Sequence, residues 1–192
     1  MSTLARFAGL LALFGGAVWV IANLIQMVAP LSYAWIGLFA SVFLIGGAVV
    51  GLQRQLGVRT GMLGRWGAAA TAAGSVALLA FLLFVVATGQ IYATTPPEPP
   101  ILLVLSLVSF LLWLIGSLVF AMVLVRAKAI SPIAGWLIVL SAVVSPVSVI
   151  VGGQNPPPFV YLPLVLFGVG WVLVGYEART PAADIGIAGQ AS

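Results

Sequence analysis

Charged side chains divide this chain into four long apolar stretches, and the lengths of these stretches predict its helices. A helix that crosses a bilayer needs about 20 residues. The two middle stretches are long enough for one crossing each, whereas the first and the last are each long enough for two. The charge-free stretches are residues 7–53, 66–97, 99–125 and 129–176. The pattern therefore predicts an all-α fold, a bundle of six transmembrane helices.

Turn signals occur where the two longest stretches have to reverse direction. Pro30 interrupts the first stretch, because proline cannot continue a helix and restricts the residue before it. A Gly- and Pro-rich run over residues 152–158 interrupts the last one. Ser131 is placed to cap the fifth helix, with Pro132 at its first position. We predict one transmembrane domain over residues 1–176, with helices over 7–28, 32–52, 66–89, 101–125, 132–151 and 159–176.

Basic residues occur on one side of the six predicted helices. They precede the first helix, follow the sixth, and lie between the second and third and between the fourth and fifth. The three opposite connections contain Glu98 and no Lys or Arg. The positive-inside rule then predicts that both termini are cytoplasmic. The basic residues are Arg6, Arg54, Arg59, Arg65, Arg126, Lys128 and Arg179.

This orientation has consequences for two segments outside the helices. The connection that carries Arg54, Arg59 and Arg65 is expected to contact anionic lipid headgroups. The polar tail over residues 177–192 contains Pro and Gly and is expected to be a disordered cytoplasmic segment. The expected partners are the lipid bilayer and either a membrane protein or a second copy of the chain. Nucleic acid is not expected.

Composition excludes a water-soluble fold. Hydrophobic residues make up 63% and charged residues 5% of the chain, against about 45–50% and about 25% in soluble domains. So few charges cannot cover a water-facing surface. All but one of the basic residues are arginine, and Ala and Gly are abundant, which suits a GC-rich bacterial genome. We predict a multi-pass protein of the bacterial cytoplasmic (inner) membrane.

The chain lacks the residues on which most membrane enzymes and metalloproteins depend. It has no His and no Cys, the usual ligands of haem, zinc and copper, so no cofactor is expected. The acidic residues Glu98, Glu177 and Asp184 are predicted on both sides of the membrane and cannot form a carboxylate pair. The only lysine, Lys128, lies near Ser131, which already serves as a helix cap. We therefore predict that the chain is not an enzyme.

Neutral polar residues form a candidate site within the predicted helices. They lie on one face of the first helix and along the fifth helix beside Pro146, in the outer half of the membrane. One interpretation is an outward-facing pocket for a small neutral or zwitterionic ligand; the preferred one is interhelical hydrogen bonding. Asn23 is expected to face another helix, with the fifth as the favoured neighbour. The candidate residues are Trp19, Asn23 and Gln26 on the first helix and Ser141, Ser145 and Ser148 on the fifth.

Small residues at four-residue spacing supply faces on which helices can approach closely, and we expect these faces to pack within the chain. They are Ala8, Ala12 and Gly16 on the first helix, Gly47 and Gly51 on the second, and Gly67, Thr71 and Ser75 on the third. The pair Ala8 and Ala12 also resembles the small-residue motif on the first helix of the substrate-binding subunits of energy-coupling-factor transporters. Those are six-span proteins of similar size. The resemblance covers these two alanines, and the chain is not assigned to that family.

Taken together, the patterns favour a non-enzymatic structural or accessory subunit of a membrane complex. The alternative is a small-solute transporter, or its membrane-embedded substrate-binding subunit, with the polar residues of the first and fifth helices lining its pocket.

Overall fold

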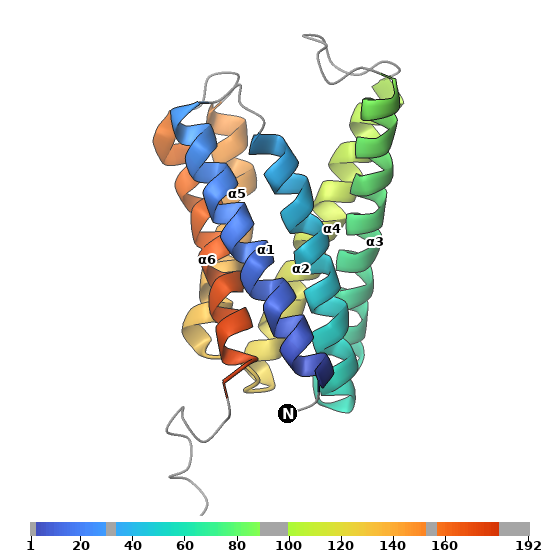
Figure 1. The fold of residues 1–192 in the computed structure, drawn as a ribbon, viewed down its shortest axis with the longest axis vertical. Coiled ribbons are helices and arrows are strands. Elements are labelled where there is room, and N and C mark those ends of the chain that lie inside the picture. The colour runs from blue at the N-terminus through green and yellow to red at the C-terminus, as the bar shows by residue number, and fades with distance from the viewer. Residues whose placement is uncertain (1–2, 30–33, 89–99, 153–156, 181–192) are drawn as a thin grey trace, which may run out of the picture.

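Six long α-helices make up most of the described part of the chain (Figure 1). The computed structural model describes residues 3–29, 34–88, 100–152 and 157–180. No strand occurs within these ranges, so the predicted all-α class is confirmed. Two short 3₁₀ helices, η1 (Gly57–Thr60) and η3 (Pro158–Tyr161), lead into the third and sixth helices. The long helices are α1 (Thr3–Val28), α2 (Ala34–Leu56), α3 (Gly61–Ala87), α4 (Pro100–Arg126), α5 (Pro132–Gly152) and α6 (Leu162–Glu177).

The helices mark the chain as a membrane protein by their length and composition. Among the described residues, four stretches are long and apolar enough to cross a membrane. One of them, of 52 residues, holds two helices, because η1 separates α2 from α3 and these two pack against each other. In α5, Pro132–Pro146 forms a shorter apolar helix. The four stretches are Arg6–Val28, Ile36–Ala87, Val104–Arg126 and Pro158–Glu177.

Some helix ends differ from the predicted ones. Helix α3 begins at Gly61 rather than at residue 66, so Arg65 lies inside it, and Arg54 lies in the last turn of α2. Charges mark where a chain leaves hydrocarbon, but a helix satisfies its own backbone hydrogen bonds and need not end there. Helix α6 begins at Leu162 rather than at residue 159, because the chain enters it through η3. Of the predicted segments, residues 32–33, residue 89 and the tail from 181 to 192 lie outside the described residues.

The helices form a ring in which each packs against the next one in the chain. The ring closes through α1 and α6, and the most extensive interfaces are α1–α2, α3–α4 and α1–α6. The α2–α3 and α4–α5 interfaces are smaller, and Figure 1 shows the upper end of α3 standing away from α2. The α3–α4 pair therefore meets α2 mainly in its lower half.

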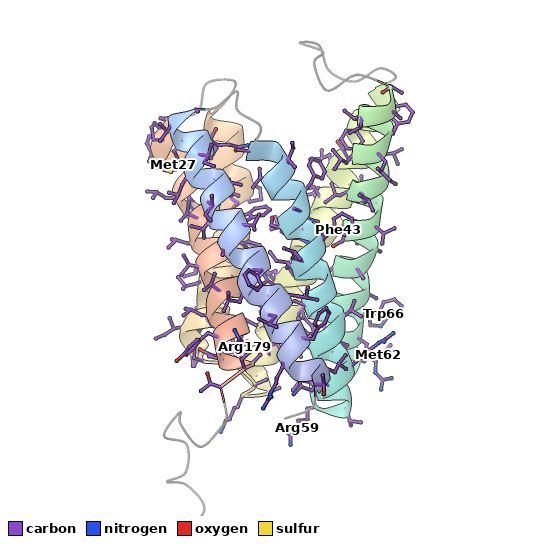
Figure 2. The ribbon with its side chains drawn as sticks, viewed as in Figure 1. Met27, Phe43, Arg59, Met62, Trp66 and Arg179 are labelled. Atoms are coloured by element: carbon purple, nitrogen blue, oxygen red, sulfur yellow. The ribbon has the colours of Figure 1, made fainter. Side chains whose placement is uncertain are left out.

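Basic residues gather at one end of the bundle, which we call the basic end. Figure 2 shows Arg59 and Arg179 at this end, near the N-terminus. The side chain of Arg179 lies beside Gly9 of α1, and Lys128, which follows α4, borders a hollow that the end of α6 also lines. The basic segments that the sequence assigns to one side of the membrane therefore share one end of the bundle.

The turn between α4 and α5 is tied to the end of α6. Ser131 caps α5 as predicted, because its Oγ accepts a hydrogen bond from the N–H of Ala134 at 3.3 Å. The N–H of Ser131 in turn donates to Oε2 of Glu177 at 2.6 Å. A carboxylate acceptor makes this a strong hydrogen bond, and it joins two segments that are 46 residues apart in sequence.

Small residues on one face of α1 set its distance from α2. Successive contacts are seven residues apart on both helices. This spacing is typical of antiparallel helices that cross at a small angle and stay in contact over a long distance. Lipid gives no hydrophobic drive between helices, so such close backbone contact is what holds them together. Of the small residues named from the sequence, Ala8 and Gly51 contact each other, so the expected packing within the chain is confirmed for this pair. The pairs in contact are Ala8 with Gly51, Gly15 with Leu44 and Ala22 with Gly37.

Candidate functional site

The polar residues predicted on α1 lie on its inner side. Trp19 and Asn23 are buried, Asn23 completely so, and Gln26 is half-buried. The indole N–H of Trp19 donates to the carbonyl oxygen of Leu164 on α6 at 2.7 Å. The side-chain amide of Asn23 donates to the carbonyl oxygen of Trp19, one turn earlier, at 2.8 Å. Both bonds end on backbone, and the first links two helices.

The main neighbours of α1 are the second and sixth helices. Helix α1 packs against α2, α6 and η3, and the hydrogen bond of Trp19 ends on α6. Helix α5 packs against α4, α6 and η3 instead. Ring closure thus places α6 against α1 and leaves α5 one position farther round. That the fifth helix is the neighbour of Asn23 itself stays a prediction.

The polar residues predicted on α5 bond within their own helix. Ser141 and Ser145 are buried, and the Oγ of Ser145 donates to the carbonyl oxygen of Ser141 at 2.5 Å. Pro146 has no N–H and so frees the carbonyl of Ala142, not that of Ser141. The carbonyl oxygen of Ser141 therefore accepts the hydroxyl of Ser145 in addition to its ordinary helical hydrogen bond. The side chain of Ser148 lies outside the described residues.

The two sets of polar residues are not joined. Among the described side chains, no hydrogen bond connects Trp19, Asn23 or Gln26 with Ser141 or Ser145. Three hollows lined by described residues lie nearer the basic end, and none of these five side chains lines them. The hydrogen bond from Trp19 to Leu164 joins two helices, whereas those of Asn23 and Ser145 stay within one helix.

Sequence reasoning missed the feature that occupies the centre of the ring, which is a group of aromatic side chains. The rings of Trp19, Trp113 and Phe167 lie in mutual contact, with centroids 5.3, 5.4 and 5.5 Å apart. They come from α1, α4 and α6, and we call them the aromatic triad. Phe110 packs on Trp113 at 5.9 Å, and Trp171 packs on Phe167 at 6.4 Å.

One signal in the sequence could have identified this group. Tryptophan in membrane proteins favours the two interfaces, where its N–H reaches water and headgroups. Trp113 and Trp171 instead stand well inside predicted helices, and the structure leaves both without solvent exposure. A tryptophan in mid-span indicates a residue that packs in the bundle interior rather than one that anchors in the aromatic belt.

Several buried polar atoms near the bundle interior have no hydrogen-bond partner within the described part of the chain. An unpartnered buried polar atom costs about 1–3 kcal/mol, so each calls for an explanation. Trp113 and Ser117 are one helical turn apart on α4 and share a face. A small polar molecule could satisfy such atoms. They are Asn23 Oδ1, Trp113 Nε1, Ser117 Oγ and Trp171 Nε1.

The small-residue face predicted on α3 contacts both neighbouring helices. Gly67 and Thr71 pack against α4 around Gly116, and the Oγ of Ser75 lies 3.2 Å from the carbonyl oxygen of Val42 on α2. A methyl group on Gly74 would lie 2.5 Å from the backbone nitrogen of Trp113. This close approach brings α4 near enough to place the Trp113 ring in the centre of the bundle.

The basic residues predicted to contact headgroups are exposed. Arg54, Arg59 and Arg65 all lie at the basic end, on α2, η1 and α3. No group of three or more His, Cys, Asp or Glu side chains that could hold a metal occurs among the residues that the structure describes.

Comparison with known proteins gives no identity for this chain. No protein-family model, no curated protein and no solved structure matches it significantly. The fold and the contacts described above therefore carry every functional inference that follows.

Proposed function

We propose that each of α1 to α6 crosses the membrane, so that the protein has six spans. The 52-residue stretch folds as two packed helices, which adds one span to the four apolar stretches, and α5 adds another. With a rise of about 1.5 Å per residue, the 21 residues of α5 reach about 31 Å, close to the hydrocarbon thickness of about 30 Å. The ring arrangement supports this count, because α5 packs on α4 and α6 as the others pack on their neighbours.

The basic end faces the cytoplasm in this proposal. The basic residues gather at one end of the bundle, and basic residues that flank transmembrane helices are retained on the cytoplasmic side. This supports the proposed orientation. Both termini are then cytoplasmic, and the protein lies in the inner membrane of a bacterium.

The protein acts as a non-enzymatic structural or accessory subunit of a membrane complex. The observation that carries this proposal is the aromatic triad, which fills the ring centre with side chains from three helices. Contacts of this kind favour a closed bundle over one built around a solute path. The hydrogen bond from Trp19 of α1 to the backbone of α6 also favours a packing role for the polar residues.

A small-solute transporter or membrane-embedded binding subunit is the second candidate. It is favoured by the unpartnered polar atoms of Asn23, Trp113, Ser117 and Trp171, which offer two N–H donors, a hydroxyl and an amide oxygen. These groups suit a neutral or zwitterionic ligand rather than an ion.

Native mass spectrometry of protein extracted in a mild detergent separates the two candidates. The accessory role predicts a second polypeptide at fixed stoichiometry. A stoichiometric small molecule without a second polypeptide would overturn it and favour the transporter. In that case the Asn23→Leu variant should lose the molecule, whereas Gln55→Leu, the same chemical change at an exposed position of α2, should keep it.

A further inference from the structure

An apolar groove lies between α1, α2 and α3 toward the basic end. Its volume is about 420 Å³, within the range of about 300–1,000 Å³ that is usual for ligand sites. The lining is apolar except at one end, where Arg54 is its single charged residue. The walls include Phe7 and Leu11 of α1, Phe43 of α2 and Val76 of α3.

The missing side chain of Gly47 keeps the groove open. Gly46 and Gly51 also line it from α2, and Ala72 lines it from α3, but Ser75 packs against Gly46 and Ala8 packs against Gly51. Gly47 is itself exposed, and the nearest atom to a methyl group placed there would be the flexible Cδ1 of Leu11, at 3.2 Å. The groove therefore has room for an occupant of modest width.

The groove opens toward the surface that faces lipid. Phe7 and Val76 are 58% and 65% exposed, although both are apolar. Along α2 the groove extends from Arg54 toward Phe43, which lies farther from the basic end than Arg59 does (Figure 2). With about 1.5 Å of rise per residue, Arg54 and Phe43 are about 16 Å apart along α2. The groove is thus elongated, apolar along its length and cationic at its end.

We propose that this groove binds one acyl chain of an anionic phospholipid, with the phosphate of the same lipid paired to the guanidinium of Arg54. A guanidinium forms strong, directional hydrogen bonds with phosphate oxygens. A transmembrane helix of a partner is about 10–12 Å across and is too thick for this groove, whereas an acyl chain is not. The inference rests on the basic end lying at the cytoplasmic leaflet, where anionic lipids gather, and not on the accessory role.

Native mass spectrometry of the full chain in detergent, with equal amounts of phosphatidylglycerol and phosphatidylcholine added, tests the proposal. The wild-type protein should retain one phosphatidylglycerol in preference to phosphatidylcholine. Arg54→Gln should lower this retention about fivefold, as expected for one basic residue near an anionic lipid, and Gly47→Leu should fill the groove and abolish it. The matched controls are Arg126→Gln, at an exposed arginine at the end of α4 outside the groove, and Ala40→Leu, at an exposed position of α2 outside the groove.

Three outcomes would overturn the proposal. They are equal retention by Arg54→Gln and Arg126→Gln, equal retention by Gly47→Leu and Ala40→Leu, and a bound polypeptide, rather than lipid, that Gly47→Leu displaces. Circular dichroism of each variant checks that it is folded. Should Gly47→Leu fail to fold, Val76→Trp narrows the groove from α3 and must also reduce lipid retention. Lipid retention is scored on the isolated chain, so loss of a partner subunit would leave the result unchanged.

Discussion

Gly16 of α1 and Gly168 of α6 bring the backbones of their two helices into direct contact. A methyl group on Gly16 would lie 2.5 Å from the carbonyl oxygen of Gly168, and one on Gly168 would lie 2.8 Å from the carbonyl oxygen of Gly16. Both obstructing atoms belong to backbone, so no side-chain rotation can make room. One heptad away, a methyl group on Gly175 would lie 2.6 Å from the carbonyl oxygen of Gly9. The closure of the helix ring depends on these contacts.

Gly16→Ala should therefore destabilise the protein by about 1–3 kcal/mol, the usual cost of overpacking. Gly47→Ala is the matched control, because the nearest atom there is the movable end of Leu11. Reversible unfolding by sodium dodecyl sulfate in mixed micelles, followed by circular dichroism, measures both. Equal stability of the two variants would show that the α1–α6 contact is not as close as described.

Trp19→Phe and Trp113→Phe remove the same atoms from two buried tryptophans. Trp19→Phe breaks the hydrogen bond to Leu164 and should cost about 0.6 kcal/mol, with an upper limit of about 1.7 kcal/mol, beyond the loss of packing. Trp113→Phe removes an N–H that has no partner within the described residues, so it should cost less. Unfolding midpoints in the same micelles give the comparison. A larger loss for Trp113→Phe would mean that its N–H binds another molecule, as the transporter candidate requires.

Lys128 ends α4 in a left-handed conformation, with φ of 51°. The N–H of Ala129 donates to the carbonyl oxygen of Leu124 at 2.9 Å, and that of Lys128 donates to Val125 at 3.0 Å. This is the helix-ending pattern in which glycine is usual. Lys128→Gly should be about 1 kcal/mol more stable than Lys128→Ala, because a Cβ is disfavoured in this region. Both variants lose the same charge, so thermal melting isolates the effect of backbone conformation, and identical melting temperatures would argue against the left-handed turn.

Glu177 holds the α4–α5 turn through its hydrogen bond from the N–H of Ser131. Glu177→Ala should lower stability by about 1.5–3 kcal/mol, the range for a bond to a charged group. Glu177→Gln keeps an acceptor oxygen and should lose less. Hydrogen–deuterium exchange at Ser131 measures the bond directly: the amide should exchange faster in the alanine variant than in the glutamine variant. Unchanged exchange in both would contradict the contact.

Topology is tested by fusing reporters to the connections. Alkaline phosphatase folds only outside the cytoplasm, so a fusion after Thr95 should be active and one after Thr60 inactive if both termini are cytoplasmic. A green fluorescent protein fusion at the same sites should give the opposite pattern. Activity at Thr60 alone would reverse the proposed orientation, and activity at both sites would overturn the span count.

The pattern of charges and apolar stretches was sufficient to predict the helices. Six segments of the required length lie between charged or proline-rich connections, and the structure has a helix at each of them. Local chemistry also determined the start of α5, where Ser131 and Pro132 form a cap that needs no distant residue. The use of Ala8 and Gly51 in packing followed from their size, since only small side chains let backbones approach within a membrane.

Tertiary structure alone decided which helices meet and what fills the space between them. The sequence favoured the fifth helix as the neighbour of the first, but the ring closes through α6, and glycines 7 residues apart on α1 and α6 let the two backbones meet. The aromatic triad joins residues of three helices that are up to 148 residues apart, and spacing within one helix cannot reveal such a contact. Apolar residues are nearly uniform around helices that face lipid on one side and protein on the other. For this reason the hydrophobic pattern predicts that a helix crosses a membrane, while complementary shape determines its neighbours.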